Sequence, residues 1–298
     1  VVVKALHDSL ADDPINRERV RSEGKALARI DHPNVVRLNA VVDDGATLLL
    51  VMQFVDGKSL DKLIEERIAE KKPMPLGEVV SLFRQMVMGV AAAHQEGLVH
   101  RDLKPANVLL RTKDGVAKVT DFGIAKTEDD AKAGRGKTQG IIGSLWYMSP
   151  EQVTGQRDLD KRVDIYALGI VLFELCCGKV PFDADSDYAI MRMHVDQEVP
   201  SITGRRPDLP PALDGIIRRA SAKHRDDRFA SCEDLLSAFD AAVAYGAAAP
   251  ATAAFLASGS DPSIGAAPPH ASQGPGGTAP LVRPASVVVP AHASMTPT

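Results

Sequence analysis

The stretch LVHRDLKPANVLL, residues 98–110, places five polar residues between two short apolar runs. Burying even an uncharged polar group without a partner costs roughly 2–7 kcal/mol, so such a cluster belongs where a ligand or an opposite charge meets it. The flanking Leu98-Val99 and the run from Val108 to Leu110 have the composition of strand ends. We therefore expect the polar residues on a loop held between two strands, where catalytic side chains often lie.

Composition limits the class of protein to which this loop belongs. The chain has 298 residues, 45% hydrophobic and 25% charged, which suffices for one large domain or for two lobes. Its net charge of -4 and the lack of a Lys/Arg run predict that nucleic acid is not a partner. The three cysteines fit neither a disulfide framework nor a zinc site, which favours a reducing cytoplasm. No apolar run reaches the roughly 18–20 residues that span a bilayer, so we expect no membrane segment in this chain.

Strand-like runs come early in the chain and helical patterns come later. Apolar runs predict strands over residues 1–3, 35–42 and 47–54. Start signals, stop signals and apolar periodicity predict helices from Pro14 to about residue 30, over Leu76–Gln95 and over residues 164–177, the last apolar nearly all round. We expect an α+β fold with a small β-rich lobe on a larger α-helical lobe, and a ligand site in the cleft between them.

The composition changes sharply near Tyr245. From Gly246 to Thr298 the chain is mostly Ala, Pro, Ser, Gly and Thr with almost no charge, so it buries too little apolar surface to fold alone. We expect a folded domain over 1–245 and a disordered Ala/Pro-rich linker or tail over 246–298. The domain is expected to divide into a small lobe, a hinge and a larger lobe at about 1–54, 53–58 and 59–245.

Three motifs resemble those of one known family. HRDLKPAN (100–107), DFG (121–123) and SPE (149–151), in this order and spacing, resemble the catalytic loop, metal-binding loop and activation-segment end of eukaryotic-like protein kinases, in the form that bacteria carry. VVVK (1–4) and the segment 164–182 are similar to the family's lysine-bearing strand and central helix. The resemblance covers about 1–240 and departs from the pattern at the start, where a Gly-rich loop is missing before Val1. We interpret the sequence as an N-terminally truncated kinase domain.

The resemblance implies transfer of the ATP γ-phosphate, whose spread negative charge must be positioned and neutralised. Asp102 would orient or accept the proton of the attacking hydroxyl, and Lys104 would reach the γ-phosphate. Asn107 and Asp121 would bind Mg²⁺, with Mn²⁺ as an alternative metal. Taken without the family, Asp102 and Asn107 also fit an Asx turn with local backbone hydrogen bonds.

The resemblance also assigns Lys4 and Glu23 to an ion pair that holds the nucleotide phosphates. Read alone, Lys4 fits a solvated lysine near a chain end, and Glu23 fits a charge on a helix surface. The helix that carries Glu23 would control whether the pair forms.

Adenine is expected to lie against the linker between the lobes. Met52 would guard the back of the pocket, Gln53 and Val55 would offer backbone groups to the base, and Asp56 would meet the ribose. These residues also fit ordinary strand packing, because side-chain identity does not reveal backbone contacts.

Control of the activity is expected to involve Arg101, Thr138 and Ser144. Arg101 precedes the catalytic Asp, and a phosphate on the activation segment can order that loop by pairing with an arginine. Thr138 lies in a glycine-rich, basic stretch and is the expected autophosphorylation site, although the stretch also fits a plain flexible loop. Ser144 stands where the family usually has Thr, and its hydroxyl is expected to bridge Asp102 and Lys104.

Two further residues of these motifs are expected to be structural. His100 fits a packed, hydrogen-bonded histidine better than a catalytic base or a metal ligand, because no second His or Cys stands at ligand spacing beside it. Glu151 and Arg228 are expected to form a buried ion pair whose loss of one partner costs roughly 3–5 kcal/mol.

The resemblance implies a protein serine/threonine kinase that binds ATP, acts on Ser/Thr hydroxyls of proteins and phosphorylates its own activation segment. The segment LKPA (103–106) is similar to the Ser/Thr-specific form. The alternatives are a catalytically impaired fragment or pseudokinase-like signalling scaffold, and a small-molecule kinase, which the DFG and SPE motifs disfavour. We expect a cytoplasmic domain capable of self-association, in a parent protein anchored to the inner membrane by a segment beyond Thr298.

Overall fold

The computed structural model describes residues 1–5, 14–43, 47–123 and 142–248. Two units are distinguished, a compact one over Val1–Ala249 and a second over Pro250–Thr298. The second unit lies outside the described residues, so the expected linker over 246–298 stays a prediction. The expected domain end at 245 also stays a prediction, and the last helix of the compact unit runs to Ala248.

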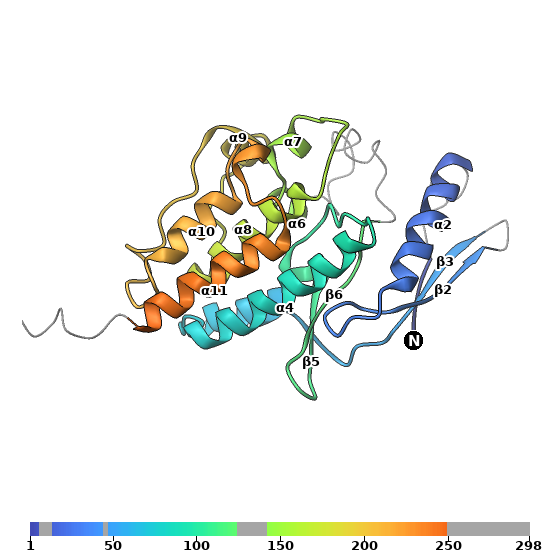
Figure 1. Ribbon diagram of the computed structural model, residues 1–298, viewed down its shortest axis with the longest axis horizontal. Coiled ribbons are helices and arrows are strands. Elements are labelled where there is room, and N and C mark those ends of the chain that lie inside the picture. Colours follow the sequence, from blue (N-terminus) through green and yellow to red (C-terminus); the bar gives the residue numbers. More distant parts are fainter. Residues whose placement is uncertain (6–13, 44–46, 124–141, 249–298) are drawn as a thin grey trace, which may run out of the picture. The chain divides into compact units, whose positions relative to one another are not determined.

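In the described residues of the small lobe, a three-stranded antiparallel sheet packs against one helix. The strands are β1 (Val2–Ala5), β2 (Leu38–Asp43) and β3 (Leu48–Met52), in the order β1-β3-β2. Lys4 on β1 lies opposite Leu50 on the central strand. The helix α2 (Pro14–Arg29) buries Val20, Gly24 and Leu27, whose spacing places them on one face, and it packs against β2 (Figure 1).

The larger lobe is built around one mostly apolar, buried helix. The helix α8 (Arg162–Cys177) has almost all of its residues buried and ends at Gly178, whose φ of 69° glycine adopts without strain. This confirms the prediction of a central helix that is apolar nearly all round. The surrounding helices, several of which are visible at one side of Figure 1, are α3 (Leu60–Ala69), α4 (Leu76–Gln95), α6 (Ile142–Leu145), α7 (Pro150–Val153), α9 (Asp187–Asp196), α10 (Ala212–Ala220) and α11 (Cys232–Ala248).

A second small sheet positions the polar loop of residues 98–110. Its strands are β4 (Gly57–Ser59), β5 (Val108–Arg111) and β6 (Ala117–Val119), antiparallel in the order β4-β5-β6. A single 3-10 turn, η1 (Pro105–Asn107), leads directly into β5, and the DFG residues follow β6. The polar cluster therefore precedes β5 and the DFG motif follows β6, and these two strands are neighbours in one antiparallel sheet. The α+β division into a small strand-rich lobe and a larger helical lobe is confirmed.

Two strand predictions were wrong in detail. Leu98 and Val99 are not in a strand, because the backbone N–H of Leu98 donates to the Ala93 carbonyl and closes the end of α4. The predicted strand over 35–42 begins only at Leu38, since Val35 forms an isolated bridge with Val119 of the other sheet. An apolar run reveals burial but not which partner strand it meets, so one run was divided between two sheets.

The helix α4 is long and apolar enough to be compared with a membrane-spanning helix. Among the described residues it is the one helix whose length and composition would allow it to cross a bilayer. Half of its most apolar window is buried within the protein, and it packs against α8 and α11. A core helix meets the same criterion, so the observation is weak, and the expected lack of a membrane segment stays a prediction.

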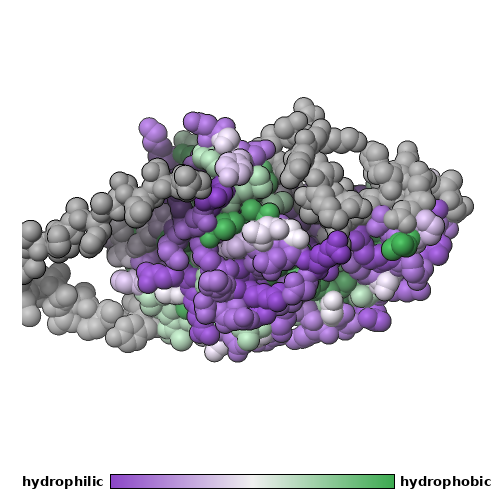
Figure 2. Space-filling view, turned by 90° about the horizontal axis from the view of Figure 1, so that it is seen from above, coloured by the Kyte–Doolittle hydropathy of each residue, from purple (hydrophilic) through white to green (hydrophobic). Residues whose placement is uncertain are grey.

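The surface seen in Figure 2 is mostly hydrophilic. In this view the hydrophobic residues of the described part of the chain form small separate groups. The exposed valines of β1, Val2 and Val3, belong to a strand that pairs with β3 alone among the described strands.

Candidate active site

The polar side chains of residues 98–110 meet on the loop between α4 and β5. The Asn107 amide nitrogen donates to the Asp102 carbonyl oxygen at 2.8 Å and to Asp102 Oδ2 at 3.3 Å. Lys104 Nζ lies 3.4 Å from Asp102 Oδ2, and both side chains are mostly buried. A carboxylate, an ammonium and an amide thus converge within hydrogen-bonding range, which a plain Asx turn does not require.

Ser144 joins this cluster from a distant part of the chain. Lys104 Nζ donates to Ser144 Oγ at 2.7 Å, and Ser144 is buried in α6. Lys104 therefore contacts both Asp102 and Ser144, so the expected contact of Ser144 with Lys104 is present, and the ammonium rather than the hydroxyl bridges the other two groups. Thr138, the expected autophosphorylation site, lies outside the described residues.

Two residues next to the reactive groups have unusual backbone conformations. Arg101 has a φ of 61° and Asp121 a φ of 55°, the left-handed region, where a residue other than glycine costs about 1–3 kcal/mol. Such conformations persist only where surrounding contacts impose them, and they concentrate at functional sites. Arg101 belongs to the HRDLKPAN motif and Asp121 to the DFG motif.

Asp164 and Gln152, which were not among the predicted site residues, hold the backbone of Arg101. The buried carboxylate of Asp164 accepts the N–H of His100 at 2.7 Å and the N–H of Arg101 at 2.8 Å. His94 Nε2 lies 2.8 Å from the same carboxylate, and Gln152 Nε2 donates to the Arg101 carbonyl at 2.8 Å. The signal in the sequence was an aspartate at the start of a mostly apolar helix, because a buried carboxylate needs donors.

The catalytic and DFG loops are bound to each other through His100. Its ring is fully buried, with Nε2 2.9 Å from the Thr120 carbonyl, and it packs 4.7 Å from the Phe122 ring. The N–H of Gly123 donates to the His100 carbonyl at 3.0 Å, and a Cβ at position 123 would lie 2.7 Å from that oxygen. The close approach explains the glycine, and the contacts match the structural role expected for His100.

Lys4 and Glu23 do not form the expected ion pair in this structure. Lys4 Nζ instead lies 2.8 Å from Asp121 Oδ1, with both side chains roughly two-fifths exposed. Glu23 Oε1 is 3.9 Å from an Arg101 guanidinium nitrogen. Burial raises the pKa of Glu23, which Arg19 and Arg101 partly offset, so the carboxyl meets cations other than Lys4.

The linker residues expected to contact adenine lie between β3 and β4. Met52 ends β3 and packs against the core, and Val55 is buried. The N–H of Gln53 donates to the Arg37 carbonyl at 2.9 Å, and the Asp56 carbonyl accepts the N–H of Thr112 at 2.9 Å. These contacts fix the segment, and its contacts with a nucleotide stay a prediction.

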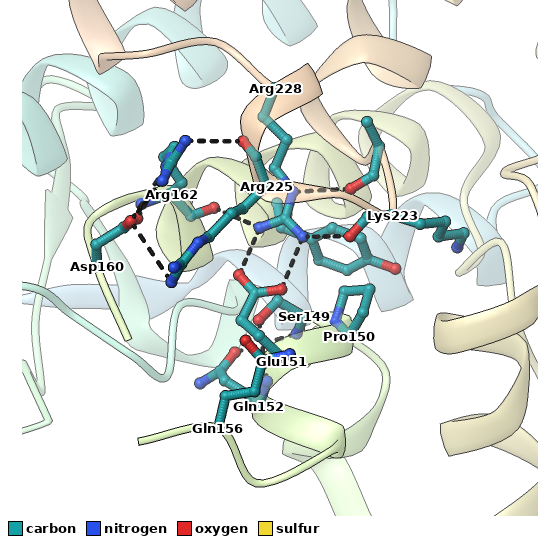
Figure 3. Close-up of polar contacts among 12 residues, drawn as sticks. Ser149, Pro150, Glu151, Gln152, Gln156, Asp160, Arg162, Lys223, Arg225 and Arg228 are labelled. Atoms are coloured by element: carbon teal, nitrogen blue, oxygen red, sulfur yellow. Dashed lines mark hydrogen bonds and ion pairs between the residues drawn. The ribbon is translucent and has the colours of Figure 1, made fainter. Parts of the chain in front are cut away.

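The predicted pair of Glu151 and Arg228 is confirmed. The two side chains are joined by two hydrogen bonds, of 2.6 and 2.8 Å, and the side chains are only 5% and 0% exposed (Figure 3). Arg228 also donates to the carbonyl oxygens of Ala222, Lys223 and Arg162. Beside the pair, Ser149 and Gln152 form a capping box that begins α7.

The residues expected to hold a divalent metal have suitable chemistry. Asp121 carries a carboxylate that already holds a cation, the ammonium of Lys4. The amide nitrogen of Asn107 donates to Asp102, which leaves the amide oxygen available as a metal ligand. Carboxylate and amide oxygens are the ligands that Mg²⁺ and similar hard cations prefer, so the pair fits such an ion.

Comparisons with known proteins agree with this geometry. The family model described as "Protein kinase domain" matches residues 1–238. A probable serine/threonine-protein kinase PknB of Lactococcus lactis is 36% identical over 80% of this chain and 36% of its own length. The serine/threonine-protein kinase PrkC of Bacillus subtilis is 37% identical over 81% of this chain and 37% of its own length.

A solved structure is also similar. The crystal structure of the Mycobacterium tuberculosis PknI kinase domain covers 80% of this chain, which covers 84% of it, with a TM-score of 0.62 at 30% identity. The chain spans between about a third and a half of the length of the first curated relatives it matches. The family match over most of the chain, the shared fold and the converging motif residues together show that the chain belongs to the protein kinase domain family, in its bacterial serine/threonine-kinase type.

Proposed function

We propose that this chain catalyses transfer of the ATP γ-phosphate to Ser or Thr hydroxyls of proteins. The observation that carries the proposal is the convergence of Asp102, Lys104 and Asn107 with Ser144, a residue 40 positions from Lys104 in sequence. The names of the relatives support the acceptor class, since they are serine/threonine-protein kinases.

The roles follow from the position of each group. Asp102 is hydrogen-bonded by Asn107 and lies beside Lys104, so its carboxylate is held in place to orient an acceptor hydroxyl and take its proton. The Lys104 ammonium, fixed between Asp102 and Ser144, supplies a positive charge to the phosphoryl group in transfer. Positioning and electrostatic stabilisation are the main contributions a protein makes to phosphoryl transfer.

Asp121 and Asn107 are the residues that would hold the divalent metal, which we propose to be Mg²⁺ with Mn²⁺ as a substitute. When bound, such an ion neutralises phosphate charge and orients the phosphate oxygens. Lys4 would leave Asp121 and turn to the nucleotide phosphates and Glu23. Its present partner is a carboxylate that is about two-fifths exposed, and exposed pairs of this kind contribute only about 0–1 kcal/mol.

We also propose a regulatory site, a set of adenosine contacts and a cellular location. Thr138 is proposed as an autophosphorylation site whose phosphate pairs with Arg101, and Met52, Gln53, Val55 and Asp56 as the adenosine contacts. We propose a cytoplasmic domain that self-associates, in a longer protein anchored to the inner membrane. A phosphopeptide map that is empty across 127–144 in an active preparation would refute the Thr138 proposal.

The direct test is transfer of labelled γ-phosphate from Mg-ATP to casein and to the chain itself, beside Asp102→Asn. General-base contributions are about 10²–10⁴-fold, so the variant should lose at least about 100-fold in rate while still binding Mg-ATP. Equal rates in both proteins would refute the role of Asp102.

A scaffold function is the second candidate, and one observation favours it. Lys4 and Glu23 are each paired with other residues, so the phosphate-binding pair is not assembled. If the chain neither binds Mg-ATP nor transfers phosphate, the scaffold function replaces the kinase function.

A further inference from the structure

A cavity lies in the larger lobe, away from the residues assigned to ATP and metal. Its volume is about 540 Å³, within the range of about 300–1,000 Å³ that small-molecule sites occupy. Its walls come from three segments: the end of α4 with Leu98 and Val99, residues 160–162 before and at the start of α8, and Ala230 ahead of α11. None of the predicted catalytic, metal or nucleotide residues lines it.

The lining combines apolar side chains with the charged residues Asp160, Lys161 and Arg162. Leu98, Val99 and Ala230 provide the apolar part of the wall. The guanidinium of Arg162 is already engaged by Asp160 at 2.8 Å and by Asp226 at 2.7 Å, the first of which is drawn in Figure 3. The Lys161 side chain is exposed and makes no side-chain hydrogen bond or ion pair with another residue in the described part of the chain, and its charge acts at longer range on the Glu233 carboxylate.

One wall of the cavity is connected to the catalytic loop. His94 lines the cavity, and its ring is 95% buried and held between Asp164 Oδ2 at 2.8 Å and Cys232 Sγ at 3.5 Å. The same Asp164 carboxylate fixes the backbone of His100 and of the strained Arg101. A molecule that shifts His94 would therefore also shift the Asp164 carboxylate, which accepts the N–H groups of His100 and Arg101 directly before Asp102.

We propose that this cavity binds a small acid with an apolar body, whose carboxylate pairs with Lys161, and that binding changes the rate of phosphoryl transfer through His94 and Asp164. The binding part stands by itself, whereas the effect on rate rests on the proposed kinase activity. The two parts therefore need separate measurements.

Binding is tested with naphthoate by saturation-transfer NMR on the full chain, in the presence of saturating Mg-ADP to keep the probe out of the nucleotide site. Lys161→Gln should weaken binding by about two- to fivefold, the range of an exposed ion pair. Ala230→Trp, which fills the cavity from an exposed position, should remove the signal. The matched control is Lys179→Gln, an exposed lysine outside the cavity, which should leave both binding and basal activity unchanged.

The uncharged naphthamide separates the effect of charge from that of shape. It should bind more weakly than naphthoate, and its affinity should not change in Lys161→Gln. Naphthoate binding that survives Ala230→Trp and Lys161→Gln alike would overturn the cavity site. The rate effect is tested as a change in kcat at unchanged KM for ATP that disappears in Ala230→Trp. Binding without any change in kcat of an active preparation overturns the link to Asp164, and a preparation that binds naphthoate but never transfers phosphate counts against the kinase proposal alone.

Discussion

The buried charged groups of the larger lobe, of which Asp164 holds the catalytic loop, differ in burial from the charged groups that link the small lobe to that loop. Glu151, Arg228 and Asp164 are almost fully buried, and each makes several short hydrogen bonds. Lys4 and Asp121 are about two-fifths exposed, and the closest contact of Glu23 with Arg101 is 3.9 Å long.

This difference separates a fixed part from an adjustable part. Breaking one partner of a buried pair leaves an uncompensated charge, so the geometry in the larger lobe cannot change without a large cost. Exposed pairs exchange partners at about 0–1 kcal/mol, so Lys4 and Glu23 can be paired with different residues at little cost. The fixed part carries Asp102, Lys104 and Asn107, and the adjustable part carries the residues expected to meet the nucleotide phosphates.

The largest effect should come from breaking the buried pair. Arg228→Met should lower the free energy of unfolding by about 3–5 kcal/mol, because Glu151 stays buried without a partner. Urea denaturation measures the change, and Arg157→Met, at an exposed arginine, is the matched control with an effect of about 0.5 kcal/mol or less. The double replacement Glu151→Met with Arg228→Met should recover much of the loss. A loss below about 1 kcal/mol in Arg228→Met would remove the distinction between the two parts.

A buried carboxyl without a cationic partner should make the protein less stable as pH rises. A carboxyl whose pKa is lowered by a cation has the opposite effect. Burial raises the pKa of Glu174 from 4.5 to about 7, and Tyr147 donates to it at 2.7 Å. Between these two values the folded protein holds a proton that the unfolded chain has released, so stability should fall as pH rises through this window and level off above about 7.

The size of that fall should be up to about 3 kcal/mol, at 1.36 kcal/mol per pKa unit. Glu174→Gln keeps an acceptor for Tyr147 and removes the titration, so its stability should stay flat across the window and exceed that of the wild type above it. Urea denaturation at several pH values measures both curves. Parallel curves would show that Glu174 titrates normally.

Asp164→Asn should have a smaller effect on stability and a clear effect on activity. Hydrogen bonds to a charged group are worth about 1.5–3 kcal/mol, and an amide oxygen replaces the carboxylate that holds His100 and Arg101. We expect a loss in that range by denaturation, together with slower phosphoryl transfer under conditions where the variant is folded. An unchanged rate would show that the catalytic loop does not depend on this carboxylate.

The smallest stability effect should come from the adjustable part. Lys4→Gln should change the free energy of unfolding by about 1 kcal/mol or less, because its pair with Asp121 is about two-fifths exposed. Mg-ATP affinity, measured by calorimetry, should nevertheless fall clearly. Lys25→Gln, at another exposed lysine of the small lobe, should alter neither quantity.

Most elements of the fold could be predicted because their sequence patterns are local. Leu76–Gln95 is helical with the predicted bounds, since its apolar spacing and its flanking residues agree. The central helix was recognisable from a long run that is apolar nearly all round. Val35 and Leu98 were assigned wrongly because each is buried by a partner distant in sequence, Val119 in one case and the end of α4 in the other.

The sequence by itself determined the reactive groups, because HRDLKPAN and DFG carry a carboxylate, an ammonium and an amide at fixed short spacings. Only the tertiary structure decided which groups meet. It brought Ser144 to Lys104, placed Asp164 beneath Arg101, and paired Lys4 with Asp121 instead of Glu23. The physical reason is that an ion pair depends on the distance and desolvation of its two partners, and both are set by packing between segments far apart in the chain.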